Sequence, residues 1–341
     1  MQTKYRPIKF PKDEQAHKHM IEWWYFNGNL KDKKGNKYAF MNTLFKVNVR
    51  RTEIPLISRW WFFKTYYFAH SIISDIGKNK SKPAVKNVVI VSKDSFSRPL
   101  LFIDYTEPIF LENFSNSIIE ETEPFHYLLK TEELDLKMKS MKKPLLEGGK
   151  GFTDVLGHKS FYYSLTNMKT SGTIKLNGKP VEVEGKTWMD HQWTNSTGYY
   201  EDKWNWFAIQ LDNNTEIMCN EYISGQKRDY LVNIVYPDGS QESLEELNLK
   251  PGAIWKSRKT KDSYPLVWKI EIPQRDIKLT VEAAVKDQEV VAGLARYWEG
   301  PIEIEGTVGD KKVKGAGFME LVNNASPYGK YGKYFINHSR G

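Results

Sequence analysis

The stretch GTIKLNGKPVEVEG, residues 172–185, decides the fold class. Apolar and polar side chains alternate on both sides of Asn177 and Gly178, which is the pattern of two half-buried strands. Both of these residues tolerate positive φ, so they predict a two-residue hairpin turn. The same alternation recurs later in the chain, in residues 268–272, 276–285, 300–306 and 315–322. The sequence therefore predicts an all-β antiparallel protein with little helix, in which residues 243–247 (SLEEL) are a short helical candidate.

An internal echo divides the chain into two parts. EWWYFNGNL (residues 22–30) and KWNWFAIQL (residues 203–211) align with a constant offset of 181 residues, which places Trp23 on Trp204. A polar turn follows each copy. Two copies of a strand that opens a sheet predict two related domains.

The boundary between these domains is expected in the polar, turn-rich residues 194–203. The predicted domains are residues 1–200 and 201–341. A chain of 341 residues with 40% hydrophobic and 14% aromatic side chains is long enough and apolar enough to bury two cores.

Charge and cysteine content exclude several classes of protein. The net charge of +8 is spread along the chain in short runs at expected turns, so we expect no nucleic-acid partner. The single Cys219 excludes an internal disulfide. The N-terminus lacks an apolar signal-peptide core, and no apolar run approaches the roughly 18 residues of a membrane span, which predicts a cytoplasmic protein. The aromatic run at residues 59–73 is interpreted as a buried strand pair, or as a patch that lines a ligand or contacts a membrane transiently.

The stretch GKTWMDHQW, residues 185–193, places an acid beside a histidine among tryptophans. If this stretch is extended, Trp188 and Asp190 share one face, and His191 and Trp193 share the other. Asp190 and His191 then point apart and do not form a dyad by adjacency.

Other chemical signatures are weak. Only His17 and His19 are spaced for shared ligation, so no metal site is expected, and no glycine-rich stretch precedes a helix signal, so no cofactor is expected. Five carboxylates stand in aromatic company: Glu22, Asp190, Glu221, Glu299 and Glu320. They are either structural carboxylates, hydrogen-bonded across the domain boundary, or carboxylic acids whose pKa is raised by apolar surroundings so that they can donate a proton.

Five motifs, in order, carry a family resemblance: EWWYFNGNL, YFAHSIISD, FYYSLTNMKTSGTIKLNG, VEGKTWMDHQW with WNWFAIQLDNNTEIM, and YWEG with IEGTVGDKKVKGAGFMELV. Over about residues 8 to 325 the chain resembles the lipocalin-like family that includes carotenoid hydratases (hydroxyneurosporene synthases) and AttH-like proteins. The resemblance implies two tandem lipocalin-like β-barrel or sandwich domains, with a ligand cavity at or near their junction.

The resemblance also implies a class of function. Its members hydrate an isolated double bond of a carotenoid or an isoprenoid arm, and distant fungal relatives cyclise polyenes by a Diels-Alder reaction. The expected activity is therefore cofactor-independent, acid-catalysed hydration of a hydrophobic isoprenoid or polyene, as by a hydro-lyase. A non-catalytic carrier and a cyclase are the alternatives, and the oligomeric state is left open.

The catalytic candidates follow from the same resemblance. A His and a Trp two residues apart match His191 and Trp193, and Tyr222 with Glu221 are the nearest counterparts of a downstream Tyr and acid, although their order and spacing differ. Asp190 or His191 is expected to donate the proton or orient the water. The expected ligand-binding residues are Glu22, Trp24, Tyr25, His70, Trp188, Trp204, Trp206 and Trp298.

Overall fold

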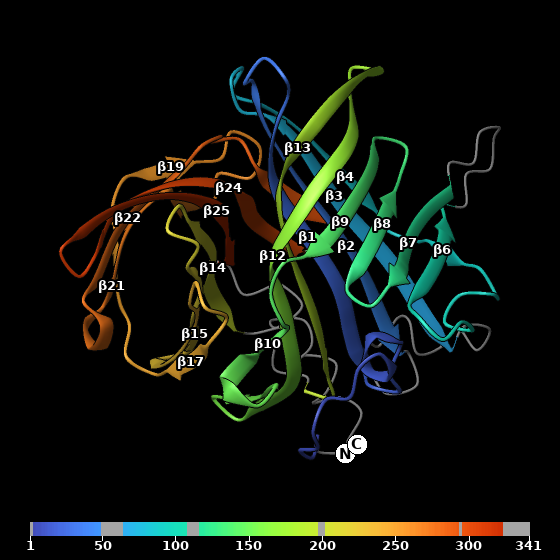
Figure 1. The fold of residues 1–341 in the computed structure, drawn as a ribbon, viewed down its shortest axis with the longest axis horizontal. Helices are drawn as coiled ribbons and strands as arrows, with labels where there is room; N and C mark the ends of the chain where they lie inside the picture. Colours follow the sequence, from blue (N-terminus) through green and yellow to red (C-terminus); the bar gives the residue numbers. More distant parts are fainter. Residues whose placement is uncertain (1–2, 49–63, 108–115, 197–201, 293–294, 323–341) are drawn as a thin grey trace, which may run out of the picture.

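Two curled antiparallel sheets contain most of the chain (Figure 1). The computed structural model describes residues 3–48, 64–107, 116–196, 202–292 and 295–322. The first sheet has the strand order β4-β3-β2-β1-β13-β12-β9-β8-β7-β6-β5, and β10 and β11 also pair with β12. Its strands are β1 (Ile21–Lys31), β2 (Lys37–Asn48), β3 (Thr65–Asp75), β4 (Lys80–Lys86), β5 (Ile90–Val91), β6 (Phe102–Thr106), β7 (Asn116–Glu123), β8 (His126–Lys130), β9 (Leu134–Ser140), β10 (Leu145–Leu146), β11 (Phe152–Val155), β12 (His158–Leu176) and β13 (Lys179–Thr194).

The second sheet has the order β17-β16-β15-β14-β25-β24-β22-β21-β18, and β23 pairs with β24. Its strands are β14 (Lys203–Leu211), β15 (Glu216–Ser224), β16 (Lys227–Val235), β17 (Gln241–Leu244), β18 (Asn248–Pro251), β21 (Val267–Ile272), β22 (Ile277–Ala283), β23 (Glu289–Ala292), β24 (Ala295–Val308) and β25 (Lys311–Val322). A small separate ribbon joins β19 (Ile254–Lys256) to β20 (Ser263–Pro265). The all-β prediction is confirmed.

Helical structure in the described residues is limited to three 3₁₀ turns: η1 (Lys12–Glu14), η2 (Glu147–Gly149) and η4 (Pro273–Arg275). The helix expected at residues 243–247 is wrong, because Ser243 and Leu244 belong to β17 and pair with β16. A local capping pattern was outweighed there by strand pairing. None of the described helices has the length and apolar character needed to cross a membrane.

The two sheets repeat one topology. β1 lies between β2 and β13, and β14 lies between β15 and β25, so each half opens with a strand that pairs with the next strand and with the closing strand. This arrangement agrees with the internal echo. The sheets divide between Thr194 and Lys203. Whether residues 1–200 and 201–341 fold as independent domains stays a prediction.

The hairpin β12–β13 is formed as the sequence predicts. Asn177 and Gly178 have φ of 51° and 76°, and Leu176 pairs with Lys179 across the turn. A bulge interrupts β12 between Leu165 and Met168, whereas β13 keeps an unbroken register with β1. The alternation along β13 is therefore intact.

Alternation along these strands creates three buried layers. One core fills the first sheet and another fills the second. Between the sheets lies a third layer, here called the seam, formed by Tyr25, Ala39, Met41, Ile72, Tyr162, Trp188, Trp206, Ala208, Met218, Leu231, Val290, Tyr297 and Phe318. In Figure 1 the long strands β12, β13 and β1 stand where the two sheets meet. Within the aromatic run, residues from Thr65 onward form β3, and residues 59–63 lie outside the described ranges.

Candidate functional site

Strand β13 sends Asp190 and His191 to opposite faces, as the sequence predicts. Asp190 is the register partner of Tyr25, and both side chains face the seam. His191 is the partner of Trp24 and lies with it in the core of the first sheet. The two residues therefore belong to two separate buried clusters.

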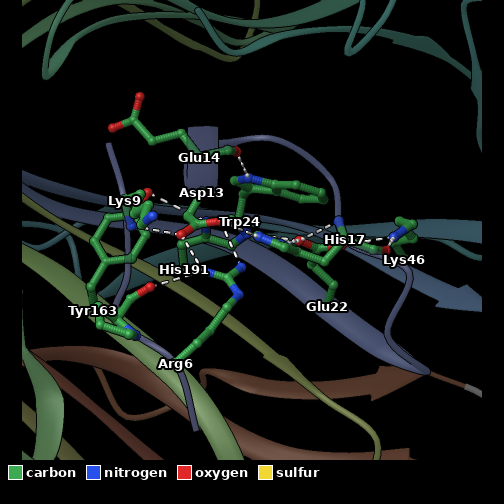
Figure 2. A network of polar contacts seen from close by, with 11 residues as sticks. Arg6, Lys9, Asp13, Glu14, His17, Glu22, Trp24, Lys46, Tyr163 and His191 are labelled. Carbon is green, nitrogen blue, oxygen red and sulfur yellow. Dashed lines mark hydrogen bonds and ion pairs between the residues drawn. The ribbon is translucent and has the colours of Figure 1, made fainter. Parts of the chain in front are cut away.

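The His191 cluster is centred on the Glu22 carboxylate, which is fully buried (Figure 2). Glu22 Oε1 lies 2.7 Å from His17 Nδ1 and 3.0 Å from His191 Nε2. Lys46 Nζ donates to Glu22 Oε2 at 2.7 Å. One carboxylate thus accepts hydrogen bonds from a lysine and two histidines.

Glu22 and His191 each keep one charge state at neutral pH. Burial raises the pKa of Glu22. The Lys46 charge and the hydrogen bonds from His17 and His191 lower it by more than burial raises it, so the pKa lies below its usual range. Burial lowers the pKa of His191 to about 4, against the opposing effect of Glu22. At neutral pH an anion faces a neutral imidazole, and neither is a source of protons.

The same cluster anchors the N-terminal segment (Figure 2). Arg6 makes a bidentate pair with Asp13 at 2.6 and 2.7 Å, and the Lys9 backbone N–H donates to Asp13 at 2.6 Å. Trp193 stacks on His17 with ring centroids 3.9 Å apart. These contacts are typical of a structural network.

Three of these side chains are close enough to share a cation, because donor atoms of His17, Glu22 and His191 all lie within 4.8 Å of one another. The Lys46 ammonium, however, is already bound to Glu22. The negative charge is balanced by the protein itself, and the spacings are those of ordinary hydrogen bonds.

The seam contains two facing rows of polar side chains. On the first sheet, neighbouring strands place five residues side by side in register: His70, Thr43, Tyr25, Asp190 and Ser164. On the second sheet the corresponding row is Glu299, Glu320, Trp206 and Asn220. The perpendicular contact of the Tyr25 and Trp206 rings, with centroids 5.6 Å apart, joins the two rows.

Asp190 is held as a hydrogen-bond acceptor. Tyr162 Oη donates to Asp190 Oδ2 at 2.6 Å, and Trp188 Nε1 donates to Oδ1 at 2.6 Å. Ser164 Oγ lies 2.6 Å from Oδ1. Burial raises the pKa of Asp190 to about 6 although these three hydrogen bonds lower it. The side chain is therefore a base whose pKa lies near neutrality.

Opposite Asp190, Glu299 and Glu320 are register partners on β24 and β25. Burial first, and then the neighbouring Glu320 charge, raise the pKa of Glu299 well above its usual range, against the opposing effect of the nearby Tyr25. Burial raises the pKa of Glu320 to about 7, against a hydrogen bond from Trp204. Two adjacent carboxylates without a cation do not both ionise, so this pair keeps a proton at neutral pH.

Tyrosines and a neutral histidine complete the seam. His70 Nδ1 lies 2.5 Å from Tyr297 Oη, and burial lowers the pKa of His70 to about 4. The buried Nε2 atom of His70 has no hydrogen-bond partner among the described residues. Trp206 Nε1 donates to Tyr162 Oη at 3.2 Å.

The structure divides the sequence-predicted residues among three layers. The seam contains Asp190, Tyr222, Tyr25, His70, Trp188, Trp204 and Trp206. The first-sheet core contains Glu22, Trp24, His191 and Trp193. Glu221 lies on the opposite face of β15 from Tyr222 and hydrogen-bonds to Asn205 at 2.8 Å, and Trp298 lies in the second-sheet core. Glu221 and Trp298 therefore lie away from the seam.

Sequence reasoning missed four seam side chains: Tyr162, Ser164, Tyr297 and Glu147. For Tyr297 alternation was the available signal, because Tyr297 is two residues from Glu299, which the sequence analysis had singled out. Trp298 was predicted to bind the ligand, yet its indole packs on the opposite face of β24 from Tyr297.

An open groove of about 940 Å³ lies apart from these clusters. Five lysines line it: Lys31, Lys142, Lys143, Lys169 and Lys186. No residue of the two polar rows contributes to it. Lys142 Nζ pairs with Glu216 at 2.6 Å and Lys31 Nζ with Glu184 at 3.4 Å, so part of its charge is neutralised.

Comparisons with known proteins agree with the resemblance seen in the motifs. A family model described as AttH-like matches residues 1–324. Kievitone hydratase of Fusarium solani subsp. phaseoli is 25% identical over 173 residues, which are 48% of this chain and 49% of that protein. Dehydratase asqC of Emericella nidulans is 23% identical over 203 residues, 55% of this chain and 57% of that protein. The chain thus spans about half the length of the curated relatives it matches.

Solved structures share the fold over most of their length. A crystal structure described as AttH, from Nitrosomonas europaea, has a TM-score of 0.76 and 22% identity, and covers 94% of this chain and 98% of its own. Kievitone hydratase from Nectria haematococca has a TM-score of 0.69 and 17% identity, and covers 93% of each chain. The lipocalin-like architecture is confirmed by these neighbours.

Proposed function

Because the chain belongs to the AttH-like family, we propose that it is a hydro-lyase that adds water to, or removes water from, a carbon–carbon double bond of a hydrophobic small molecule bound in the seam. Relatives named as a hydratase and a dehydratase support this chemistry. The observation that carries the proposal is the arrangement of Glu299 and Glu320 on one side of the seam, with Asp190 on the other side.

In the hydration direction the steps follow from the charges of these groups. The protonated carboxyl of Glu299 donates its proton to one alkene carbon, and a cation forms on the other carbon. Water attacks that cation, and Asp190 takes the proton that the water releases. Tyr25, whose pKa is raised by burial and then by the Glu299 and Asp190 carboxylates, lies beside both groups and is suited to return the proton to Glu299.

The aromatic side chains of the seam can stabilise a cationic intermediate. The ring of Trp206 and the rings of Tyr25 and Tyr162 face the same layer, and the negative faces of aromatic rings attract cations. A tertiary cation forms most readily, so a branched alkene such as an isoprenoid or polyene arm is the proposed substrate class. No protein cation pairs with Asp190, Glu299 or Glu320 in the described residues, so an intermediate cation meets only acidic, neutral and aromatic groups.

The test uses branched terpenoid alkenes in D₂O. We expect deuterium at the carbon next to the new hydroxyl, and a fall in kcat of roughly 10²-fold or more for Asp190→Asn and for Glu299→Gln. Glu221→Gln is the matched control, because Glu221 lies on the opposite face of β15 from the seam, and should keep its kcat.

Full turnover by both seam variants would refute the proposed chemistry. If the molecule copurified with the protein returns unchanged after long incubation, the chain is a carrier. If cyclisation survives both substitutions, shape and not acid catalysis is responsible.

A further inference from the structure

Glu147 lies directly behind Asp190, on the far side of one serine. Ser164 Oγ is 2.7 Å from Glu147 Oε1 and 2.6 Å from Asp190 Oδ1. All three side chains are buried, and Glu147 is fully so. Within the described residues no lysine, arginine or histidine pairs with Glu147. Two carboxyl groups therefore meet at a single hydroxyl.

The hydrogen-bond directions at Glu147 are set by Asn233. The Gly148 backbone N–H donates to Asn233 Oδ1 at 3.2 Å, which turns the Asn233 amide nitrogen toward Glu147. Asn233 Nδ2 then donates to Glu147 Oε2 at 2.5 Å. Oε2 is thus an acceptor, and Oε1 is the oxygen that faces Ser164.

Counting hydrogens decides which carboxyl is neutral. A serine hydroxyl has one hydrogen and can donate to only one of the two carboxyls. Asp190 already accepts hydrogen bonds from Tyr162 and Trp188, which is the environment of a carboxylate. Ser164 therefore donates to Asp190, and its oxygen must accept a hydrogen from Glu147 Oε1.

The surroundings of Glu147 agree with this assignment. Its titratable neighbours are Asp190 on β13, Tyr162 on β12 and Cys219 on β15, none of which supplies a positive charge. Burial, and then the Asp190 charge, raise the pKa of Glu147 well above its usual range, against the Ser164 hydrogen bond.

We infer that Glu147 is a positioning residue: it holds a proton at neutral pH and, through Ser164, keeps Asp190 in the ionised form that serves as the base. The inference rests on the proposed function of the seam. An ionised Glu147 would instead compete for the Ser164 hydrogen and repel the Asp190 charge, which would drive a proton onto Asp190 and remove the base.

Glu147→Gln is the discriminating variant, because a glutamine copies a protonated glutamic acid. Its oxygen can accept from Asn233 while its nitrogen donates to Ser164. We expect Glu147→Leu, which cannot donate to Ser164, to move the limb of the pH profile that reports Asp190 to higher pH, and Glu147→Gln to leave that limb in place. Ser164→Ala removes one donor to Asp190 and should move the limb of the pH profile that reports Asp190 to higher pH, by about one unit or more. A pH profile altered by Glu147→Gln would overturn the inference.

Infrared difference spectroscopy provides a test that needs no substrate. Wild type minus Glu147→Gln at neutral pH should show the carbonyl band of a protonated carboxylic acid. Loss of carboxylate bands instead would overturn the inference. A carbonyl band together with full activity of Asp190→Asn would leave the protonated Glu147 established, while the proposed reaction and the positioning role fail.

Discussion

Replacing Lys46 by methionine tests whether the Glu22 cluster stabilises the fold. Lys46 Nζ lies 2.7 Å from Glu22 Oε2, and the two side chains are 9% and 0% exposed. Lys46→Met keeps the apolar stem and removes the charge, so the Glu22 carboxylate loses its strongest partner while it stays in the core.

The expected cost follows from that burial. Removing one partner of a buried ion pair destabilises a protein by about 3–5 kcal/mol, because the remaining charge is left uncompensated. His17 remains 2.7 Å from Glu22, and its pKa is raised by Asp13 and Glu22 although burial lowers it. Because His17 still pairs with Glu22, we expect a loss of stability at the lower end of this range, about 3 kcal/mol.

Urea unfolding followed by tryptophan fluorescence measures the effect, and a double mutant separates charge from packing. Glu22→Gln with Lys46→Met removes both charges and should recover most of the loss. Lys33→Met is the control, since Lys33 forms a pair with Glu182 at 2.5 Å that is exposed, and it should cause no measurable change. If Lys46→Met is no more destabilising than Lys33→Met, the cluster is not a structural anchor.

Two further substitutions test other parts of the structure. Burial lowers the pKa of His191 from 6.5 to about 4, so unfolding takes up a proton between these pH values. The free energy of unfolding should therefore fall by roughly 3 kcal/mol as the pH drops from 6.5 to 4. His191→Gln should flatten this fall, as measured by urea titrations across that pH range. An unchanged slope would show that His191 is not the group responsible. A Cβ on Gly317 would lie 1.9 Å from the Ala208 carbonyl oxygen, so Gly317→Ala should cost about 1–3 kcal/mol in the same assay. Gly77→Ala is the control, because the nearest atom to its added Cβ is 3.7 Å away. Equal losses of stability in the two variants would contradict the pairing of β14 with β25.

Local patterns were sufficient to predict the strand class and the two faces of β13. A period of two depends only on neighbouring residues, so the separation of Asp190 from His191 could be derived before the fold was known. The Asn177–Gly178 turn was predictable for the same reason, because its φ angles are a property of two adjacent residues.

The partners across the seam could not be derived in this way. Glu299 meets Tyr25 only because two sheets pack together, and alternation names the face of a strand but not what covers it. Both faces of β24 are buried from Tyr297 to Ile302, so Tyr297 and Trp298 could not be told apart by apolar character. Glu147 lies in a glycine-rich turn, where no strand period indicates its direction.

The difference between the two clusters lies in their cations rather than in their acids. Glu22 is buried with Lys46 and His17, and it stays ionised at neutral pH. Glu299 is also buried, but among the described residues it has no cationic partner, so it retains its proton. An acid that must protonate an alkene has to lack a nearby lysine or arginine, whereas an acid that anchors a segment requires one. This criterion, applied to the two faces of β13, separates a stabilising carboxylate from one suited to proton transfer.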